Sequence, residues 1–85
     1  MLNEKEIVKI VESVIEEEIE INLDTVLIES GLIDSLRLMS IVDKVELSLG
    51  ITFEIDKIDM EDFETPRKIC SLIQKVQQFS DVAIL

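Results

Sequence analysis

Apolar residues recur at intervals of three and four along three stretches of the chain, and each stretch predicts an amphipathic helix. The first begins where Asn3 and Glu6 have the spacing of a capping box. Its apolar stripe consists of Ile7, Ile10, Val11, Val14 and Ile15. Glutamates crowd positions 16–18 and 20, where the negative end of the helix dipole disfavours them. We therefore expect a helix over about 4–18, ended in part by this charge.

The second helix is expected over about 35–49, with Gly50 as its terminator. Its residues separate into two faces. One is a stripe suited to a core: Leu38, Ile41, Val42, Val45 and Leu49. The other combines two apolar with two acidic residues: Leu36, Met39, Asp43 and Glu46. Two apolar residues on an otherwise acidic face exceed what a core requires, although isolated exposed apolar residues are common.

The last helix is expected over about 66–79, because Thr65 can cap it and Pro66 suits a first helical position. Its apolar stripe is Ile69, Leu72, Ile73 and Val76, continued by Phe79, and residues 81–85 are expected to be a frayed tail. Residues 20–34 form a long loop whose alternating apolar residues suggest that it is held across the bundle. Gly31 supplies a turn near its end.

Residues 51–55 alternate like a strand, but a single short strand has no partner here. An extended segment that packs Ile51, Phe53 or Ile55 into the bundle is the better interpretation. A short helix is expected at 59–63. The acidic residues around it lack the alternating ligands and central glycine of a calcium loop, so we reject an EF-hand.

Composition limits the class of protein. Eighty-five residues make one domain, spanning 1–85, and two glycines and one proline are too few turn formers for a small β fold. The expected class is all-α. A net charge of −11 argues against nucleic acid and anionic membrane surfaces, and favours basic protein partners.

The chain has no histidine, so a Ser-His or Cys-His catalytic pair and a histidine-based metal site are both excluded. We expect no catalytic and no metal-binding residue. The single Cys70 fits a reducing compartment and, in an apolar helical row, is expected to be a buried core thiol. No apolar run approaches the ~20 residues that cross a bilayer, and the start does not resemble a signal peptide. These features favour a cytoplasmic monomer without a transmembrane segment.

The most informative motif is the sequence Gly31-Leu32-Ile33-Asp34-Ser35-Leu36 at the start of the second helix. A serine in the first turn lies beside unpaired backbone N–H groups and the positive end of the helix dipole, which favour an anion. This position suits a hydroxyl that carries a phosphodiester. The simpler alternative is that Asp34 or Ser35 is an ordinary helix cap.

The motif resembles the phosphopantetheine attachment site of acyl, peptidyl and aminoacyl carrier proteins, whose second helix opens with Asp-Ser-Leu. The order of expected elements is similar to the carrier-protein four-helix bundle, with a long loop between helices I and II and a short helix III. The acidic segment 59–64 before Thr65-Pro66 is closest in pattern to D-alanyl carrier proteins. Arg37-Leu38 departs from that family, which commonly has small residues there.

The resemblance implies that Ser35 carries covalent 4'-phosphopantetheine, with Asp34, Leu36 and Gly31 as supporting motif residues. A phosphopantetheinyl transferase would add the group from coenzyme A, and would supply the base and the metal. An acyl- or aminoacyl-activating ligase would load the arm as a thioester, and a downstream transferase would unload it. The chain would be a carrier and not an enzyme, with Leu36, Met39, Asp43 and Glu46 as a candidate partner face.

A second class of function remains open from the sequence: a small acidic helical protein-interaction module that has no prosthetic group. In that interpretation Asp34 and Ser35 only begin a helix. A hydrolase that uses Ser35 fails, because the sequence offers no histidine, and no lysine close by, as a base.

Overall fold

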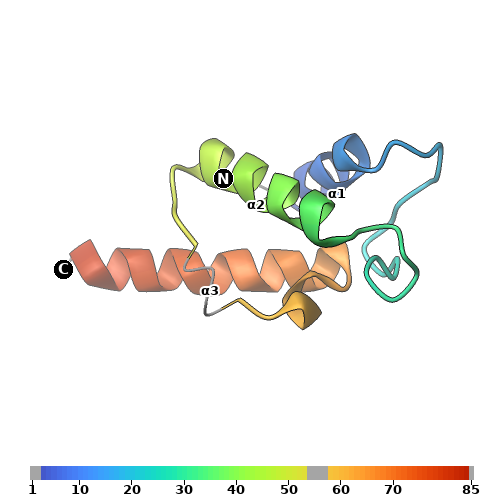
Figure 1. Cartoon of the computed structure of the whole chain (residues 1–85). Helices are drawn as coiled ribbons and strands as arrows, with labels where there is room; N and C mark the ends of the chain where they lie inside the picture. Colours follow the sequence, from blue (N-terminus) through green and yellow to red (C-terminus); the bar gives the residue numbers. More distant parts are fainter. Residues whose placement is uncertain (1–2, 54–57, 85) are drawn as a thin grey trace.

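The computed structural model describes the backbone of residues 3–53 and 58–84, and the side chains of these ranges up to Gln77. Its elements are α1 (Glu4–Val14), α2 (Ser35–Leu49), a 3-10 helix η2 (Met60–Phe63) and α3 (Pro66–Ile84). Within these ranges there is no strand, so the expected all-α class is confirmed. Figure 1 shows α3 lying along one side of the molecule, with α1 and α2 across from it.

One continuous core joins all of these elements. Helix α1 packs against both α2 and α3, and η2 packs against α3. The three α-helices contribute Ile7, Val11, Leu38, Ile41, Val42, Val45, Ile69 and Ile73. The connections contribute Ile15, Ile21, Leu27, Ile33 and Phe53, and η2 contributes Phe63. Because the connections supply so many buried residues, they are part of the core and not loose links between helices.

Helix α1 is shorter than the expected 4–18. Asn3 caps it as expected, accepting a hydrogen bond from the Glu6 N–H at 2.9 Å. The helix ends at Val14, and Ile15 is already extended while its side chain stays buried. The glutamates at 16–18 and 20 therefore lie beyond the helix and are exposed. The helix ends earlier because Ile15 reaches the core from an extended backbone, which turns the chain into the loop.

Helix α2 has the expected bounds. Asp34 caps its start, and Gly50 ends it in the left-handed conformation with φ 65°. Beyond it, Phe53 is buried, and its N–H donates to Glu46 Oε2 at 2.8 Å. Ile51 is half-buried, so the expected packing of this segment is confirmed for these two residues. Ile55, the third candidate, lies outside the described residues.

The two last elements differ from expectation in kind and length. The short helix is a 3-10 turn over Met60–Phe63 that starts one residue later than expected. The structure therefore has a single helical turn where a bundle of four α-helices would place its third. Helix α3 continues to Ile84, past the expected end at residue 79. The expectation of a frayed tail at 81–85 is therefore wrong for residues 81–84. The helix continues because no glycine or proline follows Pro66 to stop it.

Gly50 ends α2 through a left-handed backbone conformation that side-chain-bearing residues rarely adopt. A Cβ added there would meet nothing within 4 Å, so a substitution there is opposed by backbone strain alone. We expect Gly50→Ala to lower the free energy of unfolding by about 1 kcal/mol, and Gly50→Asn to lower it by less, because asparagine tolerates this conformation. Urea denaturation of both variants measures the difference. An alanine variant as stable as the wild type would contradict the left-handed cap.

Candidate functional site

The connection between α1 and α2 is fastened to α3 by its backbone. The Leu27 N–H donates to the Glu64 carbonyl oxygen at 2.8 Å, and the Arg67 N–H donates to the Leu23 carbonyl oxygen at 3.0 Å. A bidentate ion pair between Arg67 and Asp24 adds a side-chain contact, with Nε and Oδ1 at 2.9 Å. The expectation that this long loop is held across the bundle is confirmed.

A compact turn precedes the start of α2. The Ser30 hydroxyl donates to the Val26 carbonyl oxygen at 2.6 Å and lies 3.2 Å from that of Leu27. Gly31 adopts φ 83°, as its expected turn requires. The Ile33 N–H then donates to the Leu27 carbonyl oxygen at 2.9 Å, and the Ile33 side chain is buried. The chain therefore enters α2 from a fixed point two residues before Ser35.

Asp34 and Ser35 form the first turn of α2. Asp34 Oδ1 accepts a hydrogen bond from the Arg37 N–H at 2.9 Å, so Asp34 is the helix cap. Ser35 is the first helical residue and is exposed. Its hydroxyl makes no hydrogen bond within the part of the chain that the structure describes. An accessible hydroxyl at the positive end of a helix dipole can be joined to an anionic group without disturbing an existing contact.

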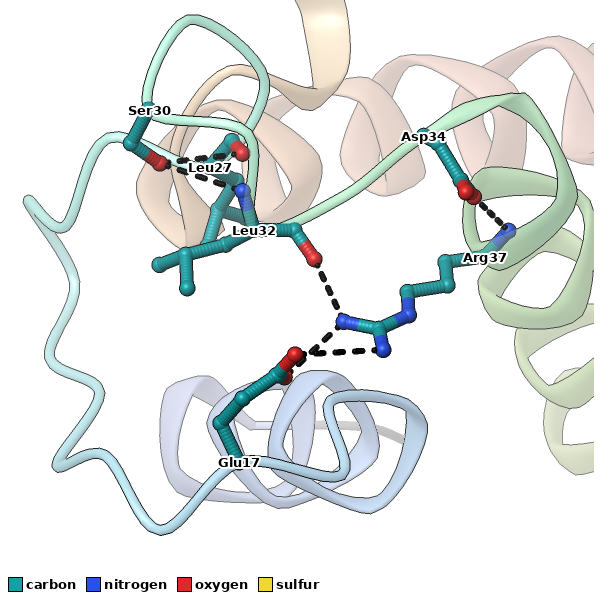
Figure 2. A network of polar contacts seen from close by, with 6 residues as sticks. All are labelled: Glu17, Leu27, Ser30, Leu32, Asp34 and Arg37. Carbon is teal, nitrogen blue, oxygen red and sulfur yellow. Dashed lines mark hydrogen bonds and ion pairs between the residues drawn. The ribbon is translucent and has the colours of Figure 1, made fainter.

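The Arg37 side chain links the start of α2 to the segment that follows α1 (Figure 2). Its Nη1 donates to Glu17 Oε2 and to the Leu32 carbonyl oxygen, each at 2.9 Å, and its Nη2 donates to Glu17 Oε1 at 3.3 Å. The Arg37 side chain is 27% exposed and that of Glu17 is 51% exposed. We call Glu17, Arg37 and the Leu32 carbonyl the Arg37 clamp.

The sequence did not reveal the Arg37 clamp. Glu17 was one of four glutamates expected to end a helix, and it lies 20 positions before Arg37. Nothing local pairs the two residues, because only the folded connection brings them together. The unusual arginine two positions after Ser35 was the one available signal.

A small apolar pocket lies beside Ser35. Its volume is about 190 Å³, and it is lined by Ser35, Leu38, Met39, Val42, Ile58 and Met60. Helix α2 forms one wall, and residues from η2 and the segment before it form the other. The pocket therefore offers apolar contact directly next to the exposed hydroxyl, and none of its described lining residues is charged.

The four residues of the candidate partner face have different surroundings. Leu36 is 80% exposed and therefore does not belong to the core. Asp43 is also exposed. Met39 is half-buried against the core, and the Glu46 carboxylate accepts the Phe53 N–H. Met39 and Glu46 thus have structural contacts as well, whereas Leu36 and Asp43 have exposed side chains.

The remaining candidates lie elsewhere. Cys70 is half-buried and not fully buried as expected, and burial raises the pKa of its thiol, which keeps it protonated. Among residues 3–53 and 58–84 no group of His, Cys, Asp and Glu could hold a metal ion. In the same ranges, no helix is long and apolar enough for a membrane span.

The fold is a small helical domain, and at the start of α2 it presents the exposed hydroxyl of Ser35. Residues 5–73 match the family described as "Phosphopantetheine attachment site". The match covers most of the 85 residues, and the chain belongs to this family. It is therefore a phosphopantetheine-bearing carrier protein, which other enzymes modify and load, and not itself an enzyme. An interaction module without a prosthetic group is excluded by this membership.

Several curated relatives share most of their length with this chain. It is 28% identical over 74 residues to a D-alanyl carrier protein of Lactobacillus delbrueckii subsp. bulgaricus, covering 87% of this chain and 92% of the relative. It is 34% identical over 56 residues to the D-alanyl carrier protein of Enterococcus faecalis, covering 66% and 72%. It is 25% identical over 76 residues to that of Leuconostoc citreum, covering 89% and 97%.

The Arg37 clamp predicts a specific pH response. Hydrogen bonds from Arg37 hold the pKa of the Glu17 carboxyl below its ordinary value of 4.5, and the same contact raises the pKa of Arg37. A carboxyl whose pKa is lowered by folding adds stability above its unfolded pKa, and that stability is lost as pH falls through the folded pKa. We expect an NMR titration to place the Glu17 midpoint below 4.5, and to return it toward 4.5 in Arg37→Met. A Glu17 midpoint that is the same in Arg37→Met and in the wild type would contradict the ion pair.

Proposed function

We propose that Ser35 is the residue that carries 4'-phosphopantetheine. The observation that supports this is the free, exposed hydroxyl of Ser35 at the first position of α2. Four other serine hydroxyls are already engaged, because each donates to a backbone carbonyl oxygen: those of Ser13, Ser30, Ser40 and Ser71. Ser48 is exposed as well, but it lies near the C-terminal end of α2, away from the positive end of the helix dipole. Among the serines whose side chains the structure describes, Ser35 alone begins a helix.

The proposed modification needs only a hydroxyl from this chain. A bond forms between Ser35 Oγ and phosphorus, while the pyrophosphate bond of coenzyme A breaks and adenosine 3',5'-bisphosphate leaves. The hydroxyl proton passes to a base of the transferase, since the chain has no histidine to accept it. Asp34 holds the helix start in place, and the exposed amide groups of the first turn favour the new phosphodiester. The phosphopantetheine thiol supplies the thioester chemistry.

The carried group is proposed to be an aminoacyl group, with D-alanine as the first to test. The relatives that match most of this chain are named D-alanyl carrier proteins. The pocket beside Ser35 supports a polar, displayed cargo. An ammonium group that entered it would lose water without meeting a charged or carbonyl partner among its lining side chains. A short aminoacyl group would therefore stay in solvent, where partner enzymes reach it.

The partners follow from this role. We propose a phosphopantetheinyl transferase, an aminoacyl-activating ligase and a downstream transferase, which meet the carrier next to Ser35. Leu36 supplies an exposed apolar anchor there, Asp43 supplies an acidic charge on the same helix, and Met39 and Glu46 border them. Burial of the anchor would add affinity, and the charge would raise the association rate. A monomeric state and a cytoplasmic location remain predictions from the sequence.

Substitution of Ser35 tests the attachment site. We expect Ser35→Ala to abolish the mass that a phosphopantetheinyl transferase and coenzyme A add to the wild-type protein, because no other oxygen takes its place. The fold should persist, and the free energy of unfolding should fall by no more than about 0.5 kcal/mol, because Ser35 is exposed and Asp34 is the cap. Intact-protein mass spectrometry measures the modification. Ser40→Ala on the same helix is the matched control and should be modified fully. A Ser35→Ala protein that still gains this mass would refute the assignment.

Two exposed leucines of α2 allow a matched test of the partner face. Leu36 is 80% exposed next to Ser35, and Leu47 is 85% exposed toward the other end of the helix. We expect Leu36→Ser to raise the KM of the transferase for the carrier several-fold, and Leu47→Ser to leave it near the wild-type value. Neither should lower stability by more than about 0.5 kcal/mol, because both side chains are exposed. Equal kinetics for both variants would contradict a face centred on Leu36.

A further inference from the structure

Three consecutive residues before Ser35 are each held by a different contact. The Leu32 carbonyl oxygen accepts from Arg37 Nη1, the Ile33 N–H donates to Leu27, and the Asp34 carboxylate accepts from the Arg37 N–H. Arg37 therefore makes two of these three contacts (Figure 2). Its guanidinium is in turn oriented by the bidentate pair with Glu17.

We propose that Arg37 and Glu17 are positioning residues for the modification of Ser35, an inference that rests on Ser35 being the attachment site. The Arg37 clamp keeps the segment 32–34 in one conformation, so that Ser35 is presented in the geometry that the transferase binds. Neither residue touches the reacting atoms. The effect passes through the Leu32 carbonyl, because the Asp34 cap is made by the Arg37 main-chain N–H and does not need the side chain.

The expected kinetic consequence is a change in KM. When only a fraction of a protein has the conformation that a partner binds, the apparent dissociation constant rises by the inverse of that fraction. Without the Arg37 clamp, the segment 32–34 keeps the Ile33 contacts but loses the one at Leu32. The KM of the transferase for the carrier should then rise about two- to fivefold, and fivefold is the upper limit for loss of one surface ion pair. The kcat should remain near the wild-type value, because the bound serine is the same.

The chain contains a matched ion pair for comparison. Arg67 and Asp24 form the same bidentate contact, at 2.9 and 3.2 Å, and tie the same connection to α3. Both pairs lower the pKa of the carboxyl through the arginine hydrogen bond. The Arg67–Asp24 pair has no contact with residues 32–34. A general loosening of the connection would follow from loss of either pair, whereas loss of positioning would follow only from loss of the Arg37 clamp.

The experiment measures the rate of phosphopantetheine addition by mass spectrometry, with a broad-specificity phosphopantetheinyl transferase, saturating coenzyme A and varied carrier concentration. The variants are Arg37→Met and Glu17→Ala, with Arg67→Met and Asp24→Ala as controls. We expect the first two to raise KM about two- to fivefold and the controls to match the wild type. Melting temperatures should fall slightly and similarly in all four. Glu17 is exposed enough that Glu17→Ala tests the proposal even if Arg37→Met folds poorly.

The two clamp variants also separate positioning from electrostatic steering. Arg37→Met makes the carrier more negative, and Glu17→Ala makes it less negative. Steering would therefore change KM in opposite directions, whereas positioning raises it in both. Opposite changes, unchanged KM, or equal changes in the control pair would each overturn the proposal. A wild-type protein that gains no mass would instead refute the proposed function.

Discussion

The contact on which the rest of the structure depends is the backbone hydrogen bond between Ile33 and Leu27. Leu27 is fully buried, and its own N–H is bonded to the Glu64 carbonyl oxygen next to α3. Ile33 is buried beside it, so the two residues join the long connection, the start of α2 and the start of α3 in one place. A hydrogen bond between buried backbone groups is costly to break, because the freed groups would find no water. Because this hydrogen bond fixes the chain just before α2, it also fixes the position of Ser35.

Charge has a different role at the surface from the one that composition suggests. The net charge of −11 suggests a uniformly acidic surface. Yet two of the few basic residues are engaged in the contacts that shape the site and the connection: Arg37 with Glu17, and Arg67 with Asp24. Lys44 likewise reaches Ser13 of α1, with Nζ and Oγ at 2.9 Å. Two basic side chains of α2 are thus engaged by α1 and by the segment that follows it.

Features of the fold that have a local cause in the sequence were predicted accurately. The bounds of α2 were correct, because Asp34 caps one end and Gly50 adopts a left-handed conformation at the other. The start of α3 was correct because proline suits a first helical position. The end of α1 was misplaced, since Ile15 continues the apolar spacing of the helix but is buried from an extended conformation. The spacing of apolar residues does not show whether Ile15 is buried from a helical or from an extended backbone.

By itself, the sequence determined the all-α class, the exposed serine at a helix start and the carrier family, because caps, helical spacing and a short motif are all local in the chain. Only the tertiary structure decided which neighbours support that serine. Glu17 meets Arg37 across 20 positions, and Glu46 turns to the Phe53 N–H, although both glutamates are ordinary acidic residues in the sequence. The pairing of exposed charges is weak, and it depends on where packing places the backbone. Burial of Leu27, Ile33 and Phe53 sets that placement, and they are buried in a core that joins residues from Ile7 to Ile73.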